Sequence, residues 1–176
     1  MNNINVDAIC EEILWYSTKN EDGKYRIPIV LDFDFTCTKK SSWINETWEE
    51  NPHCFETLKK WEKLGCVFIL DTMRGKSKIK PAIWLYKNGV NVYGIGRNPD
   101  QDSDGDASTK AWGVFSIDDR NVGSFLVYEE GERPYIDWFM TDTYLTPILK
   151  KIQLRLPELE EEVIRKKKEV YGKQRK

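Results

Sequence analysis

Three short clusters of carboxylate, hydroxyl and guanidinium side chains are the groups in this chain whose types and spacing could do chemistry together. They occupy residues 32–36 (DFDFT), 71–74 (DTMR) and 118–120 (DDR). Carboxylates that lie close together raise one another's pKa, unless a cation lies among them. A hard divalent cation that prefers oxygen ligands, Mg²⁺ above all, would relieve this repulsion and could also hold a phosphate oxygen.

Each cluster directly follows an apolar stretch that is typical of a buried strand. We expect strands at residues 27–34, 66–72, 90–95 and 112–117, and a fifth at 124–128. Amphipathic segments predict helices at residues 6–16, 51–65 and 78–88, the second capped by Asn51. This alternation predicts an α/β fold around a mainly parallel sheet. Because ligands bind beyond the carboxyl ends of parallel strands, we expect the three clusters to converge at one edge.

The residues after Pro134 carry weaker signals, which predict two further helices. The first covers Thr146 to Leu154, with Pro147 in its first turn. The second covers residues 157–175, and its acidic start and basic end suit the helix dipole. We therefore expect one domain over residues 1–156 and a charged helical tail over residues 157–176.

The composition excludes several classes of protein. The formal net charge of −2 gives no global attraction to nucleic acid, and no apolar run is long enough for a membrane span. The four cysteines form no C-x-x-C pair, and no segment looks like a secretory leader, so we predict a soluble cytoplasmic protein. His53 is the only histidine. A general acid or base is therefore expected to be a carboxylate or a lysine.

The order of the clusters resembles that of the haloacid dehalogenase-like (HAD) phosphatase superfamily. The first cluster resembles its first motif, and the hydroxyl that ends the second strand resembles its second. A lysine upstream of the paired aspartates is similar to the third and fourth motifs, and residues 117–121 are similar to small bacterial and phage members. The matching residues are Asp32, Asp34, Thr36, Thr72, Lys110, Asp118 and Asp119. The resemblance covers about residues 27–128 and implies a Rossmann-like three-layer sandwich with little or no cap.

The resemblance also implies a Mg²⁺-dependent phosphatase that hydrolyses a phosphomonoester through an aspartyl-phosphate. Asp32 would be the nucleophile, and Asp34 would protonate the leaving oxygen and later deprotonate water. Thr72 would hydrogen-bond a phosphate oxygen, and Lys110 would offset negative charge. The implied metal ligands are Asp32, the backbone carbonyl of Asp34, Asp118 and Asp119.

Two departures from the family pattern leave alternatives open. Phe35 stands where most members have glycine. The third motif has other candidates besides Lys110, namely Lys76, Lys78 and Lys80.

A separate question concerns two arginines that can bind phosphate or substrate, or instead form salt bridges with nearby carboxylates. They are Arg74 and Arg120.

The short segment at residues 37–50 leaves little room for a cap, and by resemblance such members accept bulky substrates or oligomerise. We therefore expect a phosphorylated small molecule or nucleic-acid end as substrate, no membrane partner, and a homo-oligomer as one option. One alternative is a catalytically silent HAD-like binding or regulatory module. Another is a calcium-responsive domain, because residues 100–105 copy the start of an EF-hand loop, although Ala111 stands at its twelfth position. The basic tail at residues 165–176 is expected to be a solvated helix end.

Overall fold

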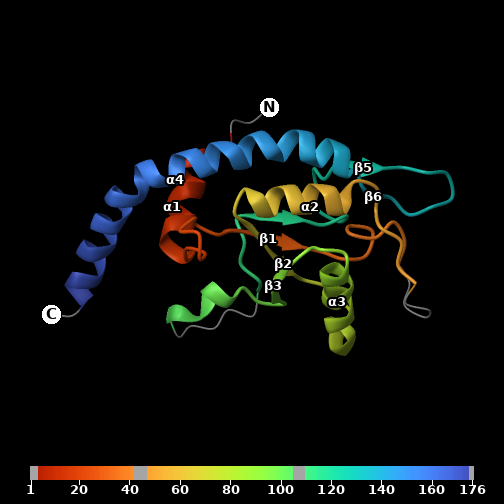
Figure 1. Ribbon diagram of the computed structural model, residues 1–176, viewed down its shortest axis with the longest axis horizontal. Coiled ribbons are helices and arrows are strands. Elements are labelled where there is room, and N and C mark those ends of the chain that lie inside the picture. The colour runs from red at the N-terminus through yellow and green to blue at the C-terminus, as the bar shows by residue number, and fades with distance from the viewer. Residues whose placement is uncertain (1–3, 42–46, 105–109, 175–176) are drawn as a thin grey trace.

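The structure, a computed structural model, describes residues 4–41, 47–104 and 110–174. Its centre is a parallel sheet with the strand order β3-β2-β1-β4. The strands are β1 (Ile27–Leu31), β2 (Cys66–Leu70), β3 (Val92–Ile95) and β4 (Phe115–Ile117) (Figure 1). The predicted α/β class with a parallel sheet is confirmed.

The register of the sheet brings the ends of three strands level with one another. Leu31, the last residue of β1, lies opposite Leu70 of β2 and Ile117 of β4. Each of these three residues is followed by an aspartate. Because β1 lies between β2 and β4, the chain leaves the sheet at three adjacent points.

In the described part of the chain, four α-helices accompany the sheet, and two short 3₁₀ helices lie between them. The α-helices are α1 (Val6–Tyr16), α2 (Cys54–Lys63), α3 (Ile79–Lys87) and α4 (Trp138–Gln174). The 3₁₀ helices are η1 (Gly75–Ser77) and η2 (Pro99–Asp104). Since α2 connects β1 to β2 and α3 connects β2 to β3, right-handed crossovers place both on the same face of the sheet.

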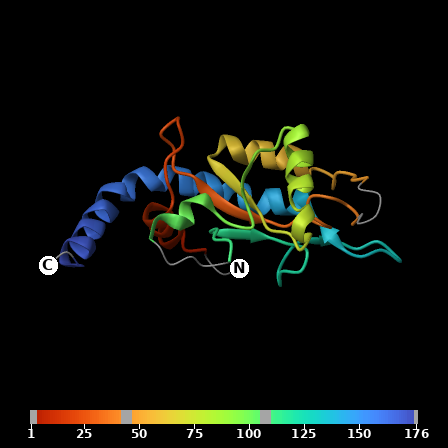
Figure 2. The ribbon, with the colours of Figure 1, turned by 90° about the horizontal axis from the view of Figure 1, so that it is seen from below.

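A second, smaller sheet contains the predicted fifth strand. β5 (Leu126–Val127) pairs antiparallel with β6 (Tyr135–Ile136) and not with the main sheet. The loop between them extends away from the body of the molecule in both ribbon views (Figures 1 and 2).

Asn51 does not cap α2, contrary to our prediction. The helix begins at Cys54 after His53, whose φ is 65° and whose side chain makes no capping bond. The Asn51 amide instead donates to the carbonyls of Thr36 and Ile136, at 2.9 and 2.8 Å. Because Asn51 is buried, its donor group needs partners there, and these two bonds fasten the loop after β1 to β6.

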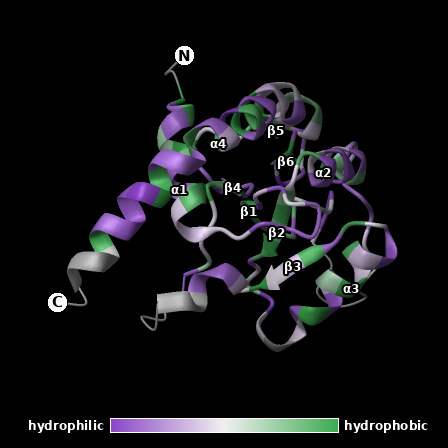
Figure 3. Cartoon of the chain, turned by 60° about the vertical axis from the view of Figure 1, so that its left-hand side comes forward, coloured by the Kyte–Doolittle hydropathy of each residue, from purple (hydrophilic) through white to green (hydrophobic). Residues whose placement is uncertain are grey.

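The C-terminal region is one helix, whereas we predicted two. α4 runs through Pro147 and Pro157, each of which lacks an N–H donor and costs a helix interior about 3 kcal/mol. Burial on the inner face of α4 offsets this cost, because Ile152 and Leu156 pack into the core and α4 lies against α1. The outer face of its second half is mostly hydrophilic (Figure 3).

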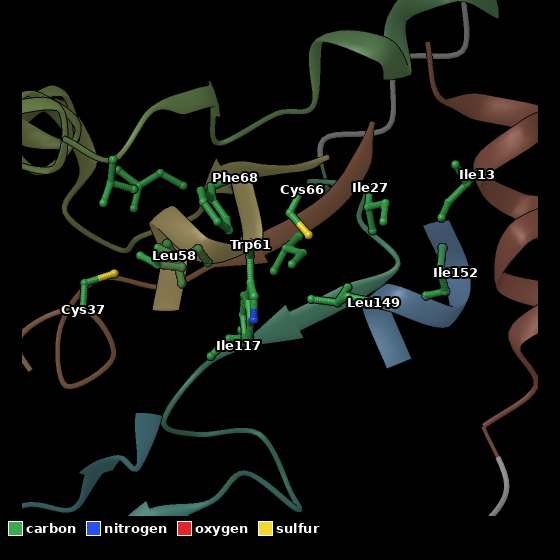
Figure 4. Close-up of a cluster of buried hydrophobic side chains, with 14 of the residues drawn as sticks. Ile13, Ile27, Cys37, Leu58, Trp61, Cys66, Phe68, Ile117, Leu149 and Ile152 are labelled. Atoms are coloured by element: carbon green, nitrogen blue, oxygen red, sulfur yellow. The ribbon is translucent and has the colours of Figure 1, made fainter. Parts of the chain in front are cut away.

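The main core lies between the sheet, α2 and the first half of α4 (Figure 4). Trp61 of α2 is fully buried, and its indole N–H donates to the Thr146 hydroxyl of α4 at 2.8 Å. All four cysteines are buried and unbridged. Within the described residues, no helix combines the length and the apolar character of a membrane span.

Two leucines of α4 allow a matched test of this packing. Leu156 is 1% exposed and Leu154 is 75% exposed. We expect Leu156→Ala to lower the free energy of unfolding by about 2–5 kcal/mol, because it leaves a cavity in the core. Leu154→Ala should change it by less than about 0.5 kcal/mol. Urea denaturation measures both, and equal losses would contradict the packing of α4 described above.

Candidate active site

The carboxyl ends of the parallel strands open into one pocket of about 240 Å³. Six of the residues predicted from the sequence line it, and they come from the ends of β1, β2 and β4. They are Asp32, Asp34, Thr72, Asp118, Asp119 and Arg120. The predicted convergence of the three clusters at one edge of the sheet is therefore observed.

Three carboxylates of this pocket form a group that could hold a metal ion. One oxygen from each of Asp32, Asp118 and Asp119 lies within 4.8 Å of the others. Burial raises the pKa of Asp32 to about 7, and the charges of Asp118, Asp119 and Asp34 add to this effect, while a hydrogen bond from the Phe33 N–H opposes it. A divalent cation would compensate this concentration of negative charge, so the donor set fits a hard cation with oxygen ligands.

Thr36 connects the end of β1 to the end of β4. Its buried hydroxyl donates to Asp32 Oδ2 at 3.4 Å and accepts from the backbone N–H of Asp119 at 3.2 Å. The Cys37 thiol donates to the backbone carbonyl of Asp32 at 3.2 Å. The loop after β1 thus fixes the Asp32 carboxylate relative to the neighbouring strand.

Arg74 pairs with Asp34, which decides between the two roles considered for this arginine. Its Nε donates to Asp34 Oδ2 at 2.8 Å, and its Nη2 donates to the other carboxylate oxygen. The guanidinium carbon lies 5.4 and 5.3 Å from the ring centroids of Phe33 and Trp48. A bidentate pair that is buried between two aromatic rings holds Asp34 in one orientation.

Phe35 keeps a backbone conformation that favours glycine. Its φ is 61°, in the left-handed region, which costs a non-glycine residue on the order of 1–3 kcal/mol. The Ile136 N–H donates to the Phe35 carbonyl at 2.9 Å, and the Arg133 guanidinium lies 4.3 Å from the centroid of the Phe35 ring. Arg133 also forms an ion pair with Asp119. Burial raises the pKa of Asp119, and Arg133 opposes that shift.

The rim of the pocket carries the remaining predicted groups. Thr72 is partly buried, and Met73 beside it is 81% exposed. The exposed Arg120 donates through its backbone N–H to Asp118 Oδ1 at 2.8 Å, and its Nη1 lies 3.8 Å from the Met73 sulfur. The Arg120 guanidinium therefore lies at the mouth of the pocket.

The structure does not bring Lys110 together with the other predicted residues. Lys110 precedes β4, and the chain between them runs beside Pro28, at the edge where the parallel strands begin. Its carbonyl accepts from the Gln101 amide at 2.7 Å. Among the alternatives, Lys78 lies near the edge of the sheet where the parallel strands end. Its Nζ is 3.0 Å from the position that a Cβ on Gly96 would occupy. The Gly96 N–H in turn donates to the carbonyl of Leu70, the last residue of β2.

The EF-hand-like segment lies partly outside the described residues. Its first residue, Asp100, accepts hydrogen bonds from the Thr18 backbone and hydroxyl and from the Tyr93 hydroxyl, at 2.8–3.2 Å. This carboxylate therefore fastens η2 to the turn after α1. Residues 105–109 are not described.

Sequence reasoning missed three residues that complete the site: Asn51, Trp48 and Arg133. Each acts on a residue far away in the chain, so no local pattern marks it. The one available signal was Phe35 itself, because a non-glycine residue at a glycine position needs compensating contacts.

Comparisons with known proteins agree with this fold. No family model matches the sequence, and no curated protein matches it. Among solved structures, the chain is similar to a conserved protein from Bacteroides thetaiotaomicron, with 25% identity and a TM-score of 0.55. The match covers 69% of this chain and 91% of that one, and the description of that protein names no activity. A parallel α/β sheet with an acidic triad is consistent with the HAD superfamily without identifying it.

We expect Mg²⁺ to raise the melting temperature of the protein, and to do so more at about pH 8 than at about pH 5. The raised pKa of Asp32 means that its ionisation costs the metal-free fold stability. That cost is absent below the ordinary pKa of an aspartate and complete above the raised one, so the metal-free protein loses stability as the pH rises between them. A cation offsets the cost at high pH and competes with a proton at low pH. Thermal denaturation in EDTA and in MgCl₂ measures the effect.

Asp118→Asn should weaken the Mg²⁺ response at least about tenfold in midpoint concentration, because it removes a charged ligand. Asp22→Asn is the control, since Asp22 lies exposed in the turn after α1. If Asp118→Asn responds like the wild type, the acidic triad does not hold the ion.

Proposed function

We propose that this protein is a Mg²⁺-dependent phosphatase of the HAD type, which hydrolyses a phosphomonoester through an aspartyl-phosphate. The observation that carries the proposal is the convergence of Asp32, Asp34, Thr72 and the pair Asp118–Asp119 in one pocket. Carboxylates for attack, for proton transfer and for metal binding, together with a hydroxyl, are the groups that such a reaction requires. The substrate is a phosphorylated small molecule or nucleic-acid end.

In the first step, an oxygen of Asp32 forms a bond to phosphorus while the bond from phosphorus to the leaving oxygen breaks. Asp34 donates a proton to that leaving oxygen. A carboxylate has about four lone-pair sites, and the bidentate contact with Arg74 uses two of them. A site therefore remains on Asp34 for the transferred proton, and Arg74 keeps that site in a fixed direction.

In the second step, a water molecule attacks the phosphorus of the aspartyl-phosphate, and Asp34 accepts the proton that the water loses. The bond between phosphorus and Asp32 breaks, and inorganic phosphate leaves. The Thr72 hydroxyl, which lines the pocket, would donate a hydrogen bond to a phosphoryl oxygen in both steps.

Asp32, Asp118 and Asp119 would hold the Mg²⁺, with the backbone carbonyl of Asp34 as a further ligand. Bound there, the ion neutralises charge on the phosphoryl oxygens and on Asp32. Arg133 already pairs with Asp119, so a metal ion bound there would share this carboxylate with the arginine.

One pair of observations favours the alternative of a catalytically silent module. Lys110 lies away from the pocket, and Arg133 occupies Asp119. A silent domain would still bind Mg²⁺ but would release no phosphate, so a turnover assay separates the two functions.

We expect the purified protein to release phosphate from an aryl phosphate and from phosphorylated oligonucleotides in MgCl₂, and not in EDTA. Asp32→Asn should lower kcat by at least about 10³-fold, because it removes the nucleophile. Asp34→Asn should slow turnover while leaving Mg²⁺ affinity largely unchanged, since its proposed metal contact is a backbone carbonyl. Activity that survives Asp32→Asn would rule out the covalent route. A complete lack of turnover on a broad panel of phosphate esters would favour the silent module.

Arg74→Lys tests whether Arg74 positions Asp34. A lysine keeps the charge but cannot make the bidentate contact, so we expect kcat to fall about 10- to 100-fold with KM little changed. Arg120→Lys is the comparison, and it should alter KM more than kcat. An unchanged kcat in Arg74→Lys would show that the bidentate contact does not position Asp34.

A further inference from the structure

One segment beside the pocket has a charge composition unlike the rest of the chain. The 28 residues from Thr72 to Pro99 contain no aspartate or glutamate, although the whole protein has 29 acidic residues and a net charge of −2. The same segment holds six basic residues. They are Arg74, Lys76, Lys78, Lys80, Lys87 and Arg97. The segment contributes Thr72 and Met73 to the rim of the pocket and also forms η1, α3 and β3. Arg74 is already paired with Asp34, so the excess positive charge of the segment comes from its four lysines and Arg97.

The exposed face of α3 alternates cationic and apolar or aromatic side chains. Ile79, Ile83 and Tyr86 follow one another at helical spacing and are 52%, 47% and 70% exposed. Lys80 and Lys87 are exposed on the same side of the helix. The opposite face, which contains Leu85, is buried. An isolated apolar residue on a surface needs no explanation, but three in a row flanked by lysines form a surface suited to a ligand.

The start of α3 lies near the edge of the sheet that carries the pocket. α3 begins seven residues after Thr72, and Lys78, at the start of α3, lies beside the end of β2. At the other end of α3, the exposed Lys59 of α2 lies against Gly89. Glu62 of α2 also lies near this end, where it accepts from the Asn91 N–H and keeps its negative charge. Cations nevertheless lie at both ends of α3.

We infer that the exposed face of α3 binds a single-stranded nucleic acid whose terminal phosphate enters the pocket. This inference rests on the proposed phosphatase function for the fate of the terminal phosphate. Lysines bind backbone phosphates, and Tyr86 offers a ring on which a base stacks. An acidic peptide would use the lysines alone and would leave the aromatic and apolar positions without a purpose. α3 is about 13 Å long, the length of roughly four stacked nucleotides.

Direct binding in EDTA tests the inference without requiring catalysis. The probes are fluorescein-labelled oligothymidylates of ten nucleotides that carry a 3′- or a 5′-phosphate. The fluorescence anisotropy of each probe, measured as protein is added, gives its affinity. Tyr86→Ala combined with Lys87→Gln should weaken binding by about tenfold or more, and the loss of one lysine should lower the salt slope by about 0.7. Lys150 is an exposed lysine of α4, a helix that Figure 1 shows well apart from α3, so Lys150→Gln should leave binding unchanged. Lys87→Gln alone is a milder second variant, and melting temperatures verify that all variants fold.

The outcomes separate this inference from the proposed function. Oligonucleotide binding that is lost in the α3 variants supports the inference even if no substrate is turned over. Equal binding by the wild type and by both α3 variants overturns it, even if an aryl phosphate is hydrolysed. Competition by a polyglutamate peptide that matches competition by unlabelled oligonucleotide would also overturn it, because the surface would then recognise acidic chains in general.

Discussion

Repulsion among carboxylates at the aligned ends of three strands is the constraint that shapes this molecule. The register that puts Leu31 level with Leu70 and Ile117 forces the following aspartates into one small space. Each of the site's partly buried carboxylates then needs a compensating charge. Asp34 has Arg74, Asp119 has Arg133, and the Asp32 group, whose pKa is raised to about 7, is left for a cation to compensate. The arginines, the aromatic rings around Arg74 and the β5–β6 pair can all be understood as supports for this arrangement.

The sequence was sufficient to predict that the aspartates after β1 and β4 and the Thr72 hydroxyl after β2 meet at one edge of the sheet, because that information is local. An apolar run followed by Asp identifies the end of a buried strand, and parallel pairing brings such ends together. The position of Lys110 was not predicted correctly from the order of the motifs. Its place in the order of motifs suggested a role, but a residue that precedes a strand lies at the opposite edge from one that follows it.

The remaining differences come from contacts between residues that are distant in the sequence. Pro157 predicted the start of a new helix, but the burial of Ile152 and Leu156 carries α4 through it. Asn is a residue type that favours helix caps, but the Asn51 amide instead donates hydrogen bonds to the loop after β1 and to β6. In both cases tertiary packing overrides a local preference. Arg133 had no local signal at all, since its role depends on a φ of 61° at Phe35, about a hundred residues earlier.

The aromatic cluster beside Arg74 joins the catalytic groups to the surface of α3. Trp84 of α3 packs edge-to-face against Phe33 and Trp48, with centroid distances of 5.6 and 5.8 Å, and those two rings enclose the Arg74 guanidinium. A displacement of α3 would therefore disturb the cage around Arg74, and with it the orientation of Asp34. A ligand that lies along the outer face of α3 would be held in register with the acid–base carboxylate through this rigid contact. Under the proposed function, the packing that stabilises the helix would also set the position of a bound nucleic-acid strand relative to the Asp34 carboxylate.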